Sequence, residues 1–195
     1  LKQLKVPIAA IVCPYINHAR TIFNGIVHIN NDNEVFQFDS AEFDLINGIG
    51  SLPDNTLRLK IYEKYKQEGY FFRNVISPQA IVSSYAVLEE GAQIMANSVV
   101  QAGVIIGENT IINSGVIIEH DCHIGKNNHI APGAVICGDV ITGPNVHIGP
   151  GSTVIQSLMV EESTVLAAGT CITQSSMKNT ITYSAKTFTK NRREL

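Results

Sequence analysis

A repeat of six residues constrains the fold of this chain more than any other feature of its sequence. Between residues 82 and 172, fifteen of the sixteen residues at six-residue intervals are aliphatic, whereas a 45% hydrophobic composition alone places about seven there. The column reads Val82, Leu88, Ile94, Val100, Ile106, Ile112, Ile118, Ile124, Ile130, Ile136, Thr142, Ile148, Val154, Val160, Leu166 and Ile172. An α-helix repeats every 3.6 residues and a strand every two, so neither sustains such a period. The repeat predicts a solenoid of short parallel strands.

The residues around this column indicate how each hexad is built. Two places before the aliphatic residue, a small or β-branched residue recurs, as at Ala92, Val104 and Ala134. Glycine follows the aliphatic residue at Gly107 and Gly125, where it can adopt backbone angles that other residues avoid. We therefore expect each hexad to supply one strand with two inward residues and then a corner.

Residues 1–77 lack the six-residue period. Segments 7–13 and 43–50 predict buried strands, and segment 71–77 predicts a further strand. Between them the sequence predicts a helix that ends near Gln67. We expect Asp54 or Asn55 to cap this helix. Its apolar face should comprise Leu57, Ile61 and Tyr65. This mixture of strands and a helix predicts a small α/β domain.

Pro78 marks the expected boundary between the two parts of the chain. The sequence thus divides into an α/β domain at 1–77, a solenoid domain at 78–175 and a C-terminal tail at 176–195. The chain opens at Leu1 with a segment typical of the last turn of a helix, so we expect a further segment before it.

Composition excludes several classes of function. A formal net charge of −3 predicts no general affinity for nucleic acid or anionic membranes. No apolar run reaches the ~20 residues that a membrane-spanning helix needs. The four cysteines form no CxxC pair, which is typical of a reducing compartment. We expect a cytoplasmic protein that binds neither nucleic acid nor a membrane.

Gly48 and Gly50 form the one glycine-rich turn of the N-terminal part. They lie between a predicted strand and the predicted helix, where a nucleotide phosphate or a uracil could approach backbone N–H groups. A tight turn without any ligand explains the same two glycines. Both interpretations stay open, and the first makes Gly48 and Gly50 candidate substrate-binding residues.

The stretch 117–138 holds the residues best suited to catalysis. His120 lies two places after inward Ile118, at a corner outside the core, and Asp121 follows it as a partner that can fix the imidazole tautomer. Gly138 lies eighteen residues after His120, so three hexads per turn would stack it beside the imidazole. A histidine base next to an exposed backbone N–H is an arrangement that favours acyl transfer.

The remaining histidines of the solenoid divide between several interpretations. His129 is nine residues from His120, half a turn away, so the two side chains meet only if a neighbouring subunit brings its own face across. Prisms with flat faces favour closed three-fold packing, which predicts a homotrimer. His147 stacks on His129 after eighteen residues. Outward or interface packing without chemistry also explains His123, His129 and His147.

Two levels of resemblance to known proteins follow from these motifs. The repeat resembles the left-handed β-helix of hexapeptide acyltransferases, in which three hexads make one coil. The run GVIIEHDCHIGKNNHIAPGAVICGDV at 115–140, the α/β part before it and the break at Pro78 are similar to the sialic acid O-acetyltransferase and bacillosamine-pathway N-acetyltransferase family. That resemblance implies a Rossmann-like N-terminal domain, here lacking its first strand, followed by a left-handed parallel β-helix.

The same resemblance implies an activity and a set of site residues. It implies transfer of an acetyl group from acetyl-CoA, the cosubstrate, to an amino sugar or sialic-type sugar, often nucleotide-linked, in surface-glycan synthesis. The active sites would lie between subunits of a homotrimer, and no metal takes part. The implied residues are His120 as general base, Asp121 as its orienting partner, His129 near the thioester, and Gly138, Ala168 and Lys186 beside the cofactor.

Two other functions remain open for a solenoid of this kind. A γ-type carbonic anhydrase would bind zinc through histidines of adjacent subunits. His123 and His129 lie 3 and 9 residues after His120, and His147 lies 18 residues after His129, so the five-residue histidine pair of that family is missing. A non-catalytic trimeric scaffold is the second alternative. The sequence leaves both the acceptor atom, nitrogen or oxygen, and the identity of the sugar undecided.

Overall fold

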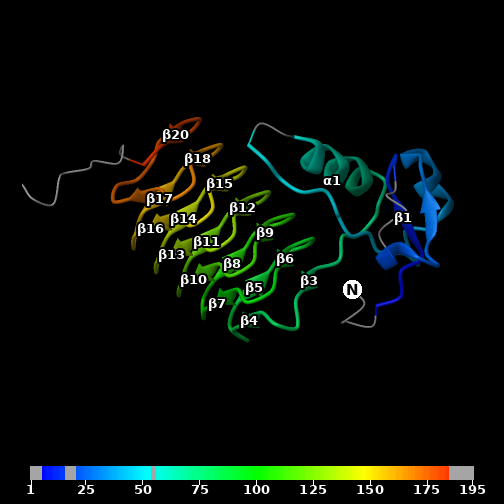
Figure 1. Ribbon diagram of the computed structural model, residues 1–195, viewed down its shortest axis with the longest axis horizontal. Helices are drawn as coiled ribbons and strands as arrows, with labels where there is room; N and C mark the ends of the chain where they lie inside the picture. The colour runs from blue at the N-terminus through cyan, green and yellow to red at the C-terminus, as the bar shows by residue number, and fades with distance from the viewer. Residues whose placement is uncertain (1–5, 16–20, 54–55, 185–195) are drawn as a thin grey trace, which may run out of the picture.

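The repeat region forms a three-sided stack of short parallel strands in the computed structural model, which describes residues 6–15, 21–53 and 56–184. Between residues 75 and 172, paired strands lie eighteen residues apart in the chain, so that Ile117 pairs with Val135 and Ile118 with Ile136. Three hexads therefore make one coil. Figure 1 shows the stack from the side, with the N-terminal residues beside it.

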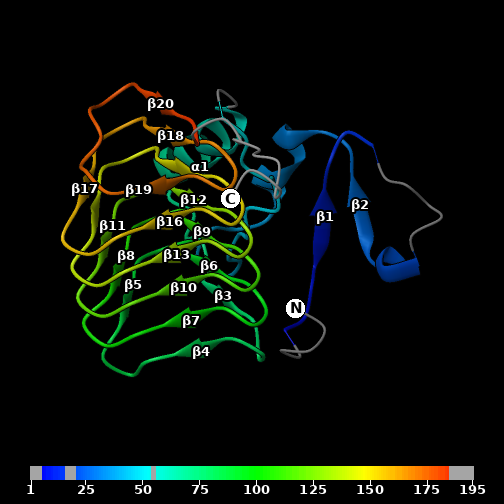
Figure 2. The ribbon, with the colours of Figure 1, turned by 60° about the vertical axis from the view of Figure 1, so that its left-hand side comes forward.

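Three parallel sheets make the faces of this prism. The first face, seen in Figure 2, comprises β4 (Ile81–Val82), β7 (Val99–Val100), β10 (Ile117–Ile118), β13 (Val135–Ile136), β16 (Thr153–Val154) and β19 (Cys171–Ile172). The second face comprises β5 (Val87–Leu88), β8 (Ile105–Ile106), β11 (His123–Ile124), β14 (Ile141–Thr142) and β17 (Met159–Val160). The third face comprises β3 (Val75–Ile76), β6 (Gln93–Ile94), β9 (Ile111–Ile112), β12 (His129–Ile130), β15 (His147–Ile148), β18 (Val165–Leu166) and β20 (Ile181–Thr182).

The predicted aliphatic column fills the interior of the prism. From Ile94 to Leu166 its members are buried almost completely. Thr142 interrupts the column, and its hydroxyl accepts hydrogen bonds from the Gly125 amide and from Nδ2 of buried Asn128. The Asn128 amide in turn donates to the Thr110 hydroxyl. Buried polar groups need hydrogen-bond partners, and the polar groups of the neighbouring coil supply those of Thr142.

From residue 91 to residue 169, the corners impose one left-handed backbone conformation in every hexad. The residue with positive φ, between 54° and 75°, recurs at six-residue intervals as Gly91, Asn97, Gly103, Asn109, Gly115, Asp121, Asn127, Gly133, Asp139, Asn145, Gly151, Ser157, Ser163 and Gly169. Glycine, asparagine and aspartate are the residues that tolerate this conformation best. The corner therefore explains part of the sequence pattern without any reference to function.

The glycines expected to supply that conformation have a different role. Gly107 and Gly125, which follow the aliphatic column, are not among the residues with positive φ. A Cβ on Gly107 would lie 2.6 Å from the carbonyl carbon of Gly125, and a Cβ on Gly125 would lie 2.5 Å from the carbonyl oxygen of Gly143. Close approach of successive coils, rather than an unusual turn, requires glycine at these positions.

The N-terminal part contains a small parallel sheet and one α-helix. β1 (Ala10–Val12) pairs with β2 (Val27–Ile29), and two 3-10 helices, η2 (Thr21–Phe23) and η3 (Asp32–Gln37), flank β2 in the chain. Helix α1 (Leu57–Gln67) follows. Its tyrosines pack with neighbouring residues in a second core made of Val35, Tyr62, Tyr65, Tyr70 and Phe72. None of the helices among the described residues is long and apolar enough to cross a membrane.

The expectations for the N-terminal part are met only in part. The α-helix is confirmed, but its buried side chains are Arg58, Tyr62 and Tyr65, whereas Leu57 is 49% exposed. Segment 43–50 was expected to form a buried strand, yet only Leu45 pairs, through a single bridge to Phe72. The expected helix cap, Asp54 or Asn55, lies outside the described residues. Aromatic packing and a buried arginine, rather than strand pairing, organise this region.

Sheet pairing also crosses the expected domain boundaries. β3 precedes Pro78 but pairs with β6, so the stack already begins at Val75. β20 lies in the segment expected to be a tail, and it pairs with β18. The β1–β2 pair is parallel, but the described N-terminal residues form no larger sheet of the Rossmann type.

Candidate functional site

His120 and Asp121 occupy the corner between the first and second faces, just after β10 and before β11. The imidazole donates a hydrogen bond from Nδ1 to Oδ2 of Asp121 at 2.9 Å. A carboxylate can only accept here, so Nδ1 carries the hydrogen and Nε2 keeps its lone pair. Both side chains are largely exposed, at 65% and 69%. The pair therefore presents a basic nitrogen to any ligand that reaches this corner.

Gly138 lies under the imidazole, one coil further on, as the eighteen-residue spacing predicts. A Cβ on Gly138 would be 2.7 Å from Cε1 and 2.8 Å from Nε2 of His120. The absence of a side chain thus leaves room for the ring against the backbone. Among the described residues, the Gly138 amide donates none of the backbone hydrogen bonds that join the coils, whereas the next amide, of Asp139, donates to the His120 carbonyl. An N–H without a backbone acceptor therefore lies next to the base.

Acidic neighbours strengthen His120 as a base. The hydrogen bond to Asp121 is the largest influence that raises the pKa of His120, and the charges of Asp121, Glu119 and Asp139 act in the same direction. Desolvation opposes them. The raised pKa makes the neutral imidazole a better proton acceptor, while the exposed ring stays accessible.

Ala168 and Lys186 were expected near the same ligand. Ala168 is exposed at the corner before β19, whereas Gly138 follows β13, so the two lie at opposite edges of the first face. Gly149 approaches the Ala168 backbone closely, since its Cβ would lie 2.7 Å from the Ala168 nitrogen. Lys186 lies outside the described residues. The structure therefore does not bring Ala168 against His120.

His129 lies on the third face, where residues of the same chain cover it. Its Nδ1 donates to the Ser51 carbonyl at 2.8 Å, and Asn113 Nδ2 donates to its Nε2 at 3.1 Å. The ring also meets His147 edge-on, with ring centroids 4.9 Å apart. Burial lowers the pKa of His129, and it lowers the pKa of His147 to about 4. Within one chain His129 therefore joins the N-terminal part to the prism.

Gly48 and Gly50 belong to the segment that ends at this histidine contact. Both are exposed, and a Cβ on either would meet nothing within 4 Å. Neither has a positive φ. Among the described residues, no tight turn and no close backbone approach requires glycine at these two positions. The space around both glycines is open.

A buried arginine that the sequence analysis did not single out holds this segment in place. Nη1 of Arg58 donates to the carbonyls of Asn47 and Ile49 at 2.8 and 2.7 Å, and its Nε donates to the Asn109 carbonyl at 3.2 Å. Gln93 on β6 also donates to the Asn47 carbonyl. An arginine among the aromatic residues of a predicted helix was the one sequence signal for this role.

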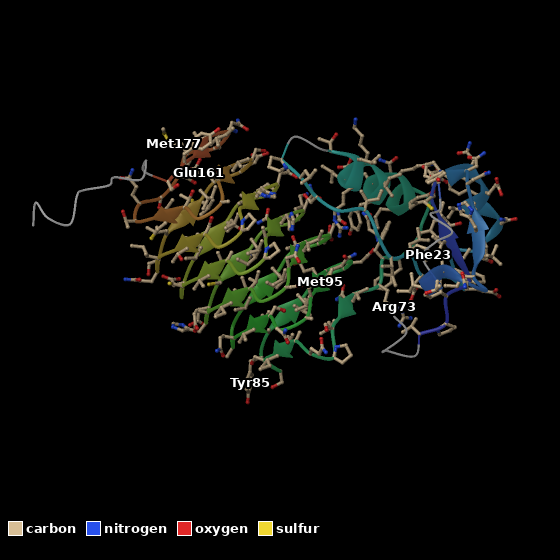
Figure 3. All side chains as sticks on the ribbon, viewed as in Figure 1. Phe23, Arg73, Tyr85, Met95, Glu161 and Met177 are labelled. Atoms are coloured by element: carbon tan, nitrogen blue, oxygen red, sulfur yellow. The ribbon has the colours of Figure 1, made fainter. Side chains whose placement is uncertain are left out.

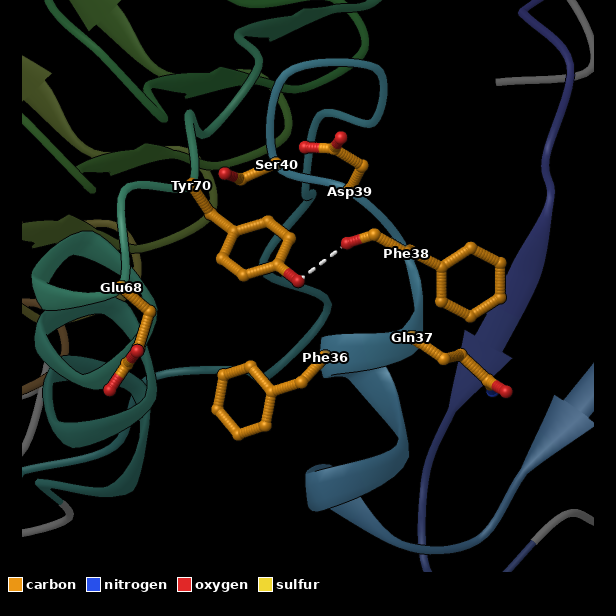
Figure 4. Close-up of a pocket in the computed structure, with 7 residues that line it drawn as sticks. All are labelled: Phe36, Gln37, Phe38, Asp39, Ser40, Glu68 and Tyr70. Atoms are coloured by element: carbon orange, nitrogen blue, oxygen red, sulfur yellow. Dashed lines mark hydrogen bonds between the residues drawn. The ribbon is translucent and has the colours of Figure 1, made fainter.

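A hollow lies between η3 and the end of α1 (Figure 4). It has a volume of about 430 Å³ and is lined by Phe36, Gln37, Phe38, Asp39, Ser40, Glu68 and Tyr70. The Tyr70 hydroxyl donates to the Phe38 carbonyl at 2.6 Å. None of the site residues expected from the sequence lines this hollow.

In the part of the chain that the structure describes, the outward histidines of the prism lie on different faces. No three histidine, cysteine, aspartate or glutamate side chains are placed there to hold a metal ion. His123 is exposed on the second face, whereas His129 and His147 are stacked on the third.

Comparisons with known proteins agree with the repeat and the fold. Residues 85–120, 108–138 and 121–156 match the family model described as bacterial transferase hexapeptide (six repeats). No curated protein matches the sequence. Among solved structures, the acetyltransferase domain of PglB from Neisseria gonorrhoeae is 26% identical with a TM-score of 0.74, covering 82% of this chain and 77% of that one. The same domain has been solved with acetyl coenzyme A.

Two further solved structures share the fold. One is a mutant of perosamine N-acetyltransferase from Caulobacter crescentus in complex with CoA and GDP-perosamine, 24% identical with a TM-score of 0.76, covering 91% of this chain and 94% of that one. The other is WeeI from Acinetobacter baumannii, 17% identical with a TM-score of 0.70, covering 88% and 81%. The chain thus carries the bacterial transferase hexapeptide repeat within residues 85–156, and its three-sided stack has the fold of these solved structures.

Proposed function

We propose that this protein transfers an acetyl group from acetyl-CoA to the amino group of a sugar in surface-glycan synthesis. The observation that carries the proposal is the His120 imidazole, oriented by Asp121 and lying against the Gly138 backbone. The likeness to the PglB acetyltransferase domain, which has been solved with acetyl coenzyme A, supports the choice of acetyl donor. These comparisons favour acetyl transfer over a zinc enzyme or an inert scaffold.

The proposed reaction is a direct attack without a covalent enzyme intermediate. Nε2 of His120 takes a proton from the acceptor amine as its nitrogen forms a bond to the thioester carbonyl carbon. The carbon–sulfur bond breaks, the electron pair leaves with sulfur, and the proton on His120 returns to give the CoA thiol. Asp121 stabilises the imidazolium between these steps, because its carboxylate already accepts the Nδ1 hydrogen.

The Gly138 amide is our candidate to stabilise the oxyanion of this reaction. It lies beside the base and donates no backbone hydrogen bond among the described residues. A preorganised N–H at the position where negative charge develops lowers the barrier without any rearrangement. We assign the pantetheine arm of acetyl-CoA to the first face, with Gly138 at one edge, Ala168 at the other and Lys186 in the following segment.

We propose that three chains assemble with the active sites between them. The N-terminal segment covers the third face around His129, whereas the outward residues of the second face form an apolar ladder with one histidine: Val87, Ile105, His123, Ile141 and Met159. His120 lies at the edge of that ladder. A second copy packed on the second face would border the His120 corner.

The N-terminal residues are our candidate for acceptor binding. We propose that the β1–β2 pair is the remainder of a Rossmann-like domain and that the open segment with Gly48 and Gly50 contacts the sugar or its nucleotide. A GDP-linked amino sugar is bound by a protein of the same fold, which makes nucleotide-linked acceptors the first to test. The four free cysteines favour a reducing compartment, and we place the protein in the cytoplasm.

The test is a thiol-release assay with acetyl-CoA and a panel of acceptors: UDP- and GDP-linked amino sugars, sialic-type acids and free sugars. We expect turnover on an amino sugar, and His120→Ala to lower kcat by at least about a hundredfold, since a general base contributes on the order of 10²–10⁴. Gln174→Ala, at the equivalent exposed corner position three coils further on, is the matched control and should leave kcat unchanged. Normal turnover by the His120 variant would refute the assignment.

A further inference from the structure

Gly103 lies one coil before Asp121, and the Asp121 carboxylate occupies the space where a side chain of residue 103 would begin. A Cβ on Gly103 would be 2.3 Å from Oδ1 and 3.3 Å from Cγ of Asp121. The other oxygen, Oδ2, accepts the hydrogen bond from His120. The missing side chain at residue 103 therefore leaves space for the carboxylate that orients the imidazole.

The backbone conformation alone does not account for glycine at this position. Gly103 has a φ of 75°, as the corner requires, but nine other positions with positive φ carry asparagine, aspartate or serine. Residues at eighteen-residue intervals stack at this corner. Tyr85, labelled in Figure 3, precedes Gly103 in that column, and Asp121 and Asp139 follow it. A non-glycine residue is thus compatible with the corner. What distinguishes Gly103 is the carboxylate that lies over it.

A side chain at residue 103 would displace the carboxylate rather than the coil. The Asp121 amide donates to the Ala102 carbonyl at 3.0 Å, which ties the two coils together directly beside the contact. The nearest atom of Asp121 is the end of a flexible, 69% exposed side chain, so rotation of that side chain relieves the collision at small cost. The imidazole would then lose its partner.

We propose that Gly103 is a positioning residue for catalysis. Because Gly103 has no side chain, the Asp121 carboxylate can lie against its backbone and accept the hydrogen bond from Nδ1 of His120, which leaves Nε2 free to act as the base. The catalytic consequence of this inference rests on the proposed function. The contact among Gly103, Asp121 and His120 does not depend on it. On one side of the pair Gly138 leaves room for the ring, and on the other Gly103 leaves room for the carboxylate. The two glycines thus flank the catalytic pair from adjacent coils.

The test substitutes alanine at two corner glycines that differ in this one respect. Gly103→Ala introduces the collision, whereas Gly115→Ala has the same kind of backbone, with a φ of 69°, and nothing within 4 Å of the new Cβ. The first readout is the pKa of His120, measured by NMR titration on the full chain. The charged groups that face the ring are Asp121, Glu119 and Asp139, and only the first makes a hydrogen bond to it.

We expect Gly103→Ala to lower the pKa of His120 toward the value that His120 has in the Asp121→Asn variant. Gly115→Ala should leave the pKa of His120 unchanged. In the thiol-release assay, kcat should fall by about tenfold or more in Gly103→Ala, with its acid limb shifted to lower pH and the KM for acetyl-CoA little changed. In an Asp121→Gly background, Gly103→Ala should have no further effect on the pKa, because the displaced group is gone.

Each result has a distinct meaning. An unchanged pKa of His120 in folded Gly103→Ala overturns the inference. If Gly103→Ala fails to fold, restored folding in the Asp121→Gly background supports the collision, and failure there overturns it. A shifted pKa in a protein that acetylates no acceptor supports the contact while refuting the proposed function, so the two failures are distinguishable.

Discussion

Replacing Arg58 should release the N-terminal segment from the prism while leaving the prism folded. Arg58 is 2% exposed, and its guanidinium donates three hydrogen bonds to the carbonyls of Asn47, Ile49 and Asn109. Burial lowers the pKa of Arg58 from 12.5 to about 10, so the group remains charged at pH 7. The side chain thus links two residues of the segment to a corner of the stack.

The magnitude follows from these contacts. Hydrogen bonds to a charged group contribute ~1.5–3 kcal/mol each, which gives about 5–9 kcal/mol for three. These values are already net of desolvation, and the buried position of Arg58 favours the low end of the range. Removal of one partner of a buried charged interaction costs ~3–5 kcal/mol, which agrees with that low end. We expect Arg58→Ala to favour opening of the segment by about a thousandfold, or ~4 kcal/mol.

Hydrogen exchange read by mass spectrometry separates local opening from global unfolding. In Arg58→Ala, peptides from 45–51 and 57–67 should lose protection, while a prism peptide such as 123–136 should keep it. Lys60→Ala, on the exposed side of the same helix, is the control. The acceptor KM should rise without a matching change in the acetyl-CoA KM, if the segment binds the acceptor. Full protection of 45–51 in Arg58→Ala would refute the reasoning.

Two further predictions concern assembly and pH. Ile141, 43% exposed in the middle of the second face, should be buried between subunits, so Ile141→Glu should convert a trimer into monomers in sedimentation analysis, whereas Leu52→Glu should not. Burial lowers the pKa of His147 from its ordinary 6.5 to about 4, so the unfolded chain binds more protons between these values. Stability should therefore be full above about pH 6.5 and fall as the pH drops toward 4. His147→Asn should flatten that decline in denaturant titrations, and an unchanged slope would contradict the assignment.

The prism could be predicted from the sequence because its contacts repeat. Each inward aliphatic residue, such as Ile118, meets its counterparts eighteen residues away, so one short pattern determines every coil. The same arithmetic predicted that Gly138 lies beside His120 and that His129 stacks on His147. Periodic contacts of this kind are readable without coordinates.

Contacts outside the period could not be read in this way. Arg58 and Ser51 meet the prism through non-repeating interactions across tens of residues, and no spacing rule predicts such pairs. For the same reason the covered state of His129 was missed: the sequence shows that it faces outward, but not what lies against it. The expected strand at 43–50 failed because aromatic packing and buried hydrogen bonds outweigh local β propensity there.

Sequence alone thus determined the coil, its inward columns and the His120–Asp121–Gly138 corner, because in a stack of identical turns distance along the chain translates into distance in space. The tertiary structure alone decided which face the N-terminal part covers, how Arg58 holds it, and that the Asp121 carboxylate lies over Gly103. These depend on side-chain orientation and on packing between segments that share no repeat, and neither is encoded in residue spacing.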